Sequence, residues 1–152
     1  PSLDQKVAII NNAVTALNNI GIECPKTAIL SASESPNPKM PESLEAVQLK
    51  EMNQQGLIKN CIIDGPLSYD LCFDPESAII KGLTSDVAGD PDLIIYPDLV
   101  TGNAVSKALV LNARAIGSSV ILGTAVPVVL PSRAASVEEK VRNILLASAS
   151  VN

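Results

Sequence analysis

The stretch LIIYPDLVTGN, residues 93–103, decides the fold class of this chain. Residues 93–95 are a short apolar run typical of a buried strand, and the turn Tyr96-Pro97-Asp98 ends it. The polar segment Thr101-Gly102-Asn103 then opens a helix that the pattern continues to about Ala115. A strand that turns directly into a helix is the repeating unit of an α/β fold.

The same alternation of strands and helices extends to both sides of this stretch. Residues 3–17 and 42–55 have apolar side chains at helical spacing, and residues 27–32 and 61–63 are β-type runs. One or two short helices are expected over residues 67–82, broken near Pro75. The pattern therefore predicts one domain over residues 1–152, a three-layer αβα arrangement with a mostly parallel sheet.

The carboxyl-terminal part should complete that sheet. Residues 120–122 and 126–130 are predicted to be two further strands. Ser136 is placed to cap a last helix. Its inner face is predicted to consist of Val137, Val141, Ile144 and Leu145.

Composition excludes several classes of function. Acidic residues outnumber basic ones by 16 to 11, and only two Tyr and one Phe are present, so a nucleic-acid surface is not expected. The chain has no uninterrupted apolar run on the order of 18 residues, so we expect no membrane span, and the amino terminus does not have the pattern of a signal peptide. Without histidine, this chain alone cannot form a Ser-His-Asp or Cys-His site.

The three cysteines fit neither a disulfide framework nor a zinc site, because their number is odd and their spacing is not that of metal ligands. Cys61 and Cys72 fall on apolar segments and are predicted to be packing residues. Reduced thiols are typical of a cytoplasmic protein, which is the compartment we expect.

Polar residues follow the predicted strands, where an open α/β sheet binds its ligands. Four loops meet this condition: Asp64-Gly65-Pro66, residues 97–103, Gly123-Thr124, and Pro131-Ser132-Arg133.

Three of the segments that contain these loops carry a family resemblance. The three segments are DGPLSYD (64–70), AGDPDLIIYPDLVTGN (88–103) and LPSRAASVEEK (130–140). They resemble the phosphate acetyl/butyryltransferases and are most similar to the butyryltransferase branch. The resemblance covers the whole chain but only about half of a family member, the carboxyl-terminal half. It implies an isocitrate/isopropylmalate dehydrogenase-like fold. It also implies reversible transfer of an acetyl or butyryl group between coenzyme A and phosphate, with coenzyme A as co-substrate and no bound cofactor or metal.

The resemblance also implies catalytic residues. Arg133 would hold the phosphoryl group, which suits the planar fork of a guanidinium, and Ser132 would donate to the developing oxyanion. Glu139 stands seven residues after the serine, where the family places a catalytic aspartate. A competing interpretation is structural, because Ser136 and Glu139 also fit a capping box at a helix start.

A second group of residues is predicted to bind substrate. Thr101, Gly102 and Asn103 lie at a helix amino terminus, where free N–H groups favour an anion, and Lys107 follows one turn later. Asp64-Gly65 would shape the floor of the pocket or would form an ordinary turn.

Two alternatives stay open. A non-catalytic acyl-CoA or nucleotide-binding domain, or an inactive fragment, would fit a chain that lacks the amino-terminal half of its relatives. A metal-dependent dehydrogenase of the same fold would need a carboxylate cluster, for which Asp86, Asp90 and Asp92 are the nearest candidates. Many apolar helix faces favour a homo-oligomer.

Overall fold

The computed structural model describes residues 1–151, and it has the α/β alternation that the sequence predicts. Most predicted elements are present, with boundaries shifted by a few residues. The elements in chain order are α1 (Leu3–Asn19), β1 (Lys26–Leu30), α2 (Pro41–Gln54), β2 (Ile62–Leu67), α3 (Tyr69–Phe73), α4 (Pro75–Ile80), β3 (Leu93–Ile95), α5 (Leu99–Asn112) and α6 (Val137–Ala149).

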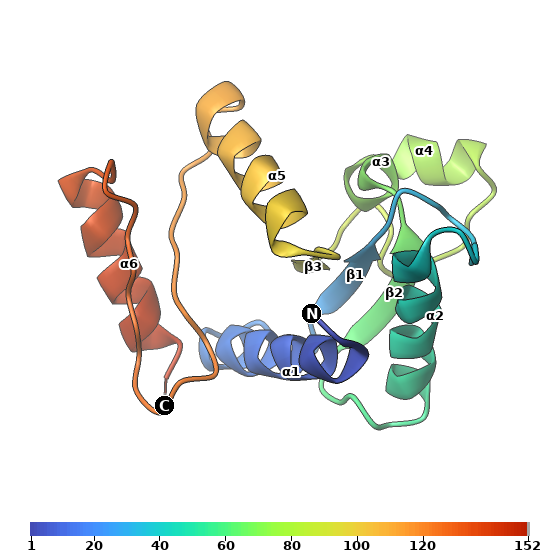
Figure 1. The fold of residues 1–152 in the computed structure, drawn as a ribbon, viewed down its shortest axis with the longest axis horizontal. Coiled ribbons are helices and arrows are strands. Elements are labelled where there is room, and N and C mark those ends of the chain that lie inside the picture. The colour runs from blue at the N-terminus through green and yellow to red at the C-terminus, as the bar shows by residue number, and fades with distance from the viewer. Residues whose placement is uncertain (152) are drawn as a thin grey trace.

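The sheet consists of three parallel strands in the order β2-β1-β3, so β1 is the central strand (Figure 1). Successive side chains of β1 point to opposite faces of the sheet. Ile29 packs in a cluster with α1 and α2, whereas Ala28 and Leu30 pack with α3, α4 and Val87 on the other face. Residues 1–95 therefore form the predicted three layers of helix, sheet and helix.

Strand β2 is longer than the sequence indicated. It was predicted to stop at Ile63, yet it continues through Asp64, Gly65 and Pro66 to Leu67. The extension is possible because Gly65 has no side chain: a Cβ there would lie 2.8 Å from Ile29 Cβ and 3.0 Å from Ile29 O. The glycine allows β2 to lie close to the central strand.

The two strands predicted over residues 120–122 and 126–130 do not form, and this is the main correction to the predicted fold. A lone antiparallel bridge joins Ile121 and Val128. These residues lie against the carboxyl-terminal half of α1 rather than beside β3, because a shared cavity is lined by Asn12, Thr15, Ile121 and Gly123. An extended segment becomes a strand of a sheet only by hydrogen bonding to the edge of a neighbouring strand, and residues 120–130 do not lie beside one.

The predicted inner face of α6 is also wrong. Val137, Val141, Ile144 and Leu145 are exposed by 50–71% of their surface, whereas Asn143 and Ala147 are the buried residues of this helix. Figure 1 shows α6 and the extended segment before it at the opposite end of the molecule from α3 and α4. We call residues 113–151 the C-terminal arm.

A polar cluster ties three segments together beside the carboxyl ends of β1 and β2. Lys81 Nζ, just after α4, binds Glu34 in the loop after β1 and donates to Asp70 Oδ2 of α3 at 2.6 Å. Ser68 Oγ donates to Asp70 Oδ1 at 2.6 Å and lies 3.0 Å from Glu34 Oε1. The bond from Lys81 lowers the pKa of Asp70 to about 2.

None of the helices in residues 1–151 has the length and apolar character needed to cross a membrane.

Gly65→Ala is expected to destabilise the fold by about 1–3 kcal/mol, because the added methyl overlaps Ile29 of the neighbouring strand. The free energy of unfolding in urea measures the change. Gly117→Ala is the matched control, since the nearest atom to its Cβ is Val110 Cγ2 at 3.5 Å, an ordinary contact. Equal stability of the two variants would contradict the packing argument.

The Lys81 cluster predicts an acid titration. A carboxyl whose pKa falls from 3.8 to about 2 on folding contributes stability that is present above pH 3.8 and is lost as the pH falls through about 2. In Lys81→Met the pKa of Asp70 should rise toward 3.8, as followed by NMR of the carboxyl carbon. Asp74, whose pKa is lowered by its bond from Ser77, is the internal control and should not move.

Candidate functional site

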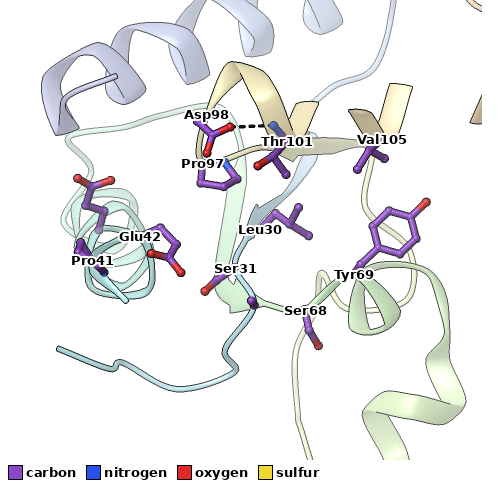
Figure 2. Close-up of a pocket in the computed structure, with 12 residues that line it drawn as sticks. Leu30, Ser31, Pro41, Glu42, Ser68, Tyr69, Pro97, Asp98, Thr101 and Val105 are labelled. Atoms are coloured by element: carbon purple, nitrogen blue, oxygen red, sulfur yellow. Dashed lines mark hydrogen bonds between the residues drawn. The ribbon is translucent and has the colours of Figure 1, made fainter. Parts of the chain in front are cut away.

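One cavity opens at the carboxyl ends of the parallel strands, the position at which open α/β sheets bind ligands. Its volume is 700 Å³, and it is enclosed by the ends of β1 and β2, the start of α2 and the start of α5. Figure 2 shows the apolar side chains of Leu30 and Val105 on its walls, with Ser31, Tyr69 and Thr101. We call it the sheet-edge cavity.

The charged residues that line the sheet-edge cavity are all acidic. Glu42, Glu45 and Asp98 line it, and no Lys or Arg does among the described residues. The carboxylate of Glu45 is bound by Lys6, whose side chain is only 5% exposed. A phosphate in this cavity would face carboxylates at close range, which Coulomb repulsion disfavours.

The start of α5 does not offer the predicted anion site. Asp98, not Thr101, is the N-cap, so the helix begins earlier than the sequence indicated. Asp98 Oδ1 accepts a hydrogen bond from the Thr101 N–H at 2.7 Å, shown as a dashed line in Figure 2, and this bond lowers the pKa of the Asp98 carboxyl. The protein's own carboxylate therefore occupies the position at which an anion was expected.

A second cavity of 590 Å³ lies between α5 and the C-terminal arm, and we call it the arm cavity. Its walls are the carboxyl-terminal half of α5, residues 115–119, the segment before α6, and the start of α6. Three predicted site residues line it, Lys107, Ser132 and Glu139, although they come from separate parts of the sequence. Arg133 is not among the lining residues but is the chain neighbour of Ser132 and is exposed.

Helix α5 separates the two cavities. Thr101 and Val105 line the sheet-edge cavity, whereas Ser106, Lys107 and Val110 line the arm cavity. Because a helix turns by about 100° per residue, these two sets lie on opposite faces. Asn103 lies four residues before Lys107 and so shares its face.

The predicted group Thr101, Gly102 and Asn103 is therefore divided between the two faces of α5. Gly102 has a packing role, since a Cβ there would lie 3.3 Å from the ring of Tyr96.

Asp64 and Gly65 lie on the floor of neither cavity. Both are in β2, where Asp64 Oδ1 accepts from the Gly65 N–H at 2.8 Å and from Lys50 Nζ at 2.7 Å. These contacts stabilise the sheet and its covering helix α2. Asp64 and Gly65 are therefore strand residues and not part of a turn, because β2 continues to Leu67.

Glu139 takes part in the N-cap of α6 through its backbone N–H, and it also lines the arm cavity. Ser136 Oγ accepts from the Glu139 N–H at 3.2 Å, which is half of a capping box. The other half would be a bond from the Ser136 N–H to the Glu139 side chain, and residues 1–151 contain no such bond. In α1 the equivalent residues Ser2 and Gln5 form both halves. The two interpretations of Glu139 are thus compatible.

The sequence analysis missed Arg142. This half-buried residue of α6 lines the arm cavity, and its Nε donates to the carbonyl of Gly117 at 3.3 Å. Its spacing could have revealed it, because Arg142 follows Glu139 by three residues and so lies on the same side of the helix.

The predicted packing of Cys61 and Cys72 is confirmed. Both are buried members of the core clusters, and burial raises the pKa of each thiol to about 11. Such thiols stay protonated near neutral pH and are poor nucleophiles.

Two of the three aspartates considered for a metal, Asp90 and Asp92, have other partners. Lys26 Nζ binds Asp90, and the Lys26 N–H donates to Asp92 at 2.8 Å. Residues 1–151 contain no group of three His, Cys, Asp or Glu side chains placed to hold a metal ion.

Comparison with known proteins identifies the family. The model of the family described as phosphate acetyl/butaryl transferase matches residues 1–148. Phosphate acetyltransferase of Thermotoga maritima is 48% identical over 97% of this chain and 50% of its own length. Phosphate butyryltransferase of Clostridium acetobutylicum is 43% identical over 97% of this chain and 49% of its own length. These two identities do not separate an acetyl from a butyryl branch.

The fold comparison agrees with the sequence comparison. The crystal structure of a branched-chain phosphotransacylase from Enterococcus faecalis V583 superposes with a TM-score of 0.89 at 35% identity, over 100% of this chain and 56% of that one. The chain thus spans about half the length of the curated relatives it matches. By the match over residues 1–148 and these identities, the chain belongs to the phosphate acetyl/butyryltransferase family.

Proposed function

We propose that this chain forms part of a phosphate acyltransferase, which reversibly transfers a short-chain acyl group, butyryl or acetyl, between coenzyme A and inorganic phosphate. The observation that carries the proposal is the arm cavity, because it brings Lys107 of α5 together with Ser132 and Glu139 of the C-terminal arm. The family supplies the reaction, and the cavity supplies residues of the right chemistry for it. The isocitrate/isopropylmalate dehydrogenase-like fold of the whole enzyme is part of the same proposal.

In the proposed reaction the sulfur of coenzyme A attacks the carbonyl carbon of an acyl phosphate. A carbon–sulfur bond forms, the carbonyl oxygen becomes an oxyanion, and the carbon–oxygen bond to phosphate then breaks to release phosphate. Glu139 takes the thiol proton as the general base. For this step its carboxylate lies within hydrogen-bond reach of the thiol in the complex. The longer side chain of glutamate moves its carboxyl outward relative to the family's aspartate.

Ser132 and Arg133 act on the charges that develop in this reaction. The Ser132 hydroxyl donates to the oxyanion, a charge that is greatest in the transition state, and donors of this kind contribute about 3–4 kcal/mol. Arg133 holds the phosphoryl group through paired hydrogen bonds. Arg133 is exposed and directly follows Ser132, which lines the arm cavity.

The charges that line the two cavities support binding of the anionic substrates in the arm cavity. Among residues 1–151, Lys107 and Arg142 line that cavity with a single carboxylate, Glu139, whereas the sheet-edge cavity is lined by carboxylates and by no cation. Acyl phosphate, phosphate and coenzyme A all carry negative charge. We therefore place acyl-CoA and phosphate binding between α5 and the arm, with coenzyme A as co-substrate and no resident cofactor.

The C-terminal arm supports a further component of the proposal, a complementary half of the enzyme. Four large apolar side chains of α6 are each at least half exposed. Helix α5 has no buried residue. An amphipathic helix is stabilised by burying its apolar stripe. We propose that the half of the relatives that this chain does not cover packs on α6 and closes the arm cavity.

The assembly and compartment of the enzyme belong to the same proposal. Exposed Phe73, Ile79 and Ile80 on α3 and α4 lie away from the arm and support a homo-oligomer. The three free cysteines support a cytoplasmic location, because thiols stay reduced there.

Acyl transfer is tested by release of the coenzyme A thiol from butyryl-CoA in the presence of phosphate, or of arsenate to make the reaction irreversible. The chain is assayed alone and joined behind the uncovered half of the Thermotoga maritima relative. Ser132→Ala should reduce kcat about 10²–10³-fold, and Arg133→Ala should reduce activity and weaken phosphate saturation. Arg114→Ala, which removes an arginine lining neither cavity, is the control.

A joined chain that is inert with acetyl-, butyryl- and branched acyl-CoA alike would overturn the transferase proposal. A chain that binds acyl-CoA without turnover in that assay would instead establish a non-catalytic binding domain.

The docking proposal predicts that Val141→Asp lowers association with the complementary half when the two are supplied as separate chains. A charge in the middle of an apolar contact should weaken binding at least tenfold, because burying an unpaired carboxylate is costly. Co-elution in size-exclusion chromatography measures it. Lys140→Asp, the adjacent residue, is the control. Identical elution of the wild type and both variants with no complex formed would contradict a docking role for α6.

A further inference from the structure

Arg142 is held in a defined place between α6 and the wall of the arm cavity. Its Nε donates to the Gly117 carbonyl at 3.3 Å, and the next residue, Asn143, accepts from the Ser119 N–H at 2.8 Å through Oδ1. Asn143 is completely buried. Two adjacent side chains of α6 therefore clamp residues 117–119, which form one wall of the cavity.

This anchoring leaves most of the guanidinium free to bind something else. A guanidinium has five N–H donors in a planar fork, and the Gly117 carbonyl accepts one of them. Among residues 1–151 no carboxylate lies within 4.0 Å of its nitrogen atoms. Arg142 is half-buried, so its charge is less screened than that of an exposed arginine.

The neighbours of Arg142 in the arm cavity indicate what it would bind. Lys107 lines the same cavity from α5, and Ser132 and Glu139 line it from the arm. A planar fork with free parallel donors fits two oxygens of one phosphate, a geometry that a lysine does not provide.

We propose that Arg142 binds a phosphate group in the arm cavity, with Lys107 facing it across the same cavity. The phosphate is either the inorganic or acyl-linked phosphate that takes part in the reaction, or a phosphate of coenzyme A. The identity of the ligand rests on the proposed function, but the anion site itself rests on the geometry of Arg142. Glu139 is a chain neighbour on the same side of α6, so a phosphate at Arg142 lies beside the proposed general base.

The test is isothermal titration of the chain with three probes: inorganic phosphate, coenzyme A and pantetheine, which has no phosphate. Arg142→Gln should weaken binding of the phosphate-bearing probe roughly tenfold to a hundredfold, the usual contribution of a charge-assisted hydrogen bond. Pantetheine binding should not change. Lys140→Gln, on the same helix but outside the cavity lining, removes the same charge and is the matched control.

The probe that responds identifies the source of the phosphate. Loss of affinity for inorganic phosphate places the reacting phosphate at Arg142, and loss confined to coenzyme A places a phosphate of the co-substrate there. Unchanged binding of both probes, an equal loss in Lys140→Gln, or a wild-type chain that binds neither probe would overturn the proposal.

Arg142→Lys separates ligand binding from a structural role. Lysine keeps the charge but loses the bond from Nε to Gly117, so a ligand role predicts partial retention of phosphate affinity. Equal and complete loss in the Gln and Lys variants, together with a lowered Tm, would show that Arg142 acts only by anchoring residues 117–119. If the Gln variant does not fold, the Lys variant alone decides between these outcomes. Phosphate binding through Arg142, with no acyl transfer by the chain joined behind the uncovered half of the relative, would contradict the proposed function and leave the anion site standing.

Discussion

Parallel pairing of β1 with a strand on each side is the constraint on which the rest of the structure depends. The central strand supplies side chains to both faces of the sheet, Ile29 to one and Ala28 with Leu30 to the other, and every helix of the first 95 residues packs on one of these faces. The pairing with β2 is close because Gly65 has no side chain where it meets Ile29. Since all three strands are parallel, their carboxyl ends meet at one edge, which places the sheet-edge cavity there.

Helix α5 divides the polar chemistry of the molecule into two parts. One of its faces closes the acidic sheet-edge cavity, and the other closes the arm cavity with its lysine, arginine, serine and glutamate. By Coulomb's law the acidic cavity repels an anion, whereas the cations that line the arm cavity attract one. The helix can play this part because Asp98 caps it and Gly102 packs closely against Tyr96 at its start.

The C-terminal arm has a polar contact with α1 and leaves the apolar stripe of α6 uncovered. Asn19 Nδ2 donates to the Ser150 carbonyl at 2.9 Å, and Asn143 is buried while the apolar stripe of α6 is exposed. The side-chain nitrogen Nδ2 of Asn143 is buried without a hydrogen-bond partner in residues 1–151. The curated relatives that the chain matches are about twice as long.

The sequence by itself determined what depends on neighbours in the chain: the positions of most helices and strands, the capping of α6, the burial of Cys61 and Cys72, and the family. It failed where the outcome depends on distant partners. Residues 120–130 have strand-forming composition but meet no free strand edge, and α6 has an apolar stripe that nothing in residues 1–151 covers. Only the tertiary structure showed that Thr101 and Lys107 line different cavities and that Asp64 and Gly65 lie within the sheet. It also showed that Arg142 lines the same cavity as Ser132 and Glu139. The physical reason is that periodicity shows which residues share a face, whereas packing decides what that face meets.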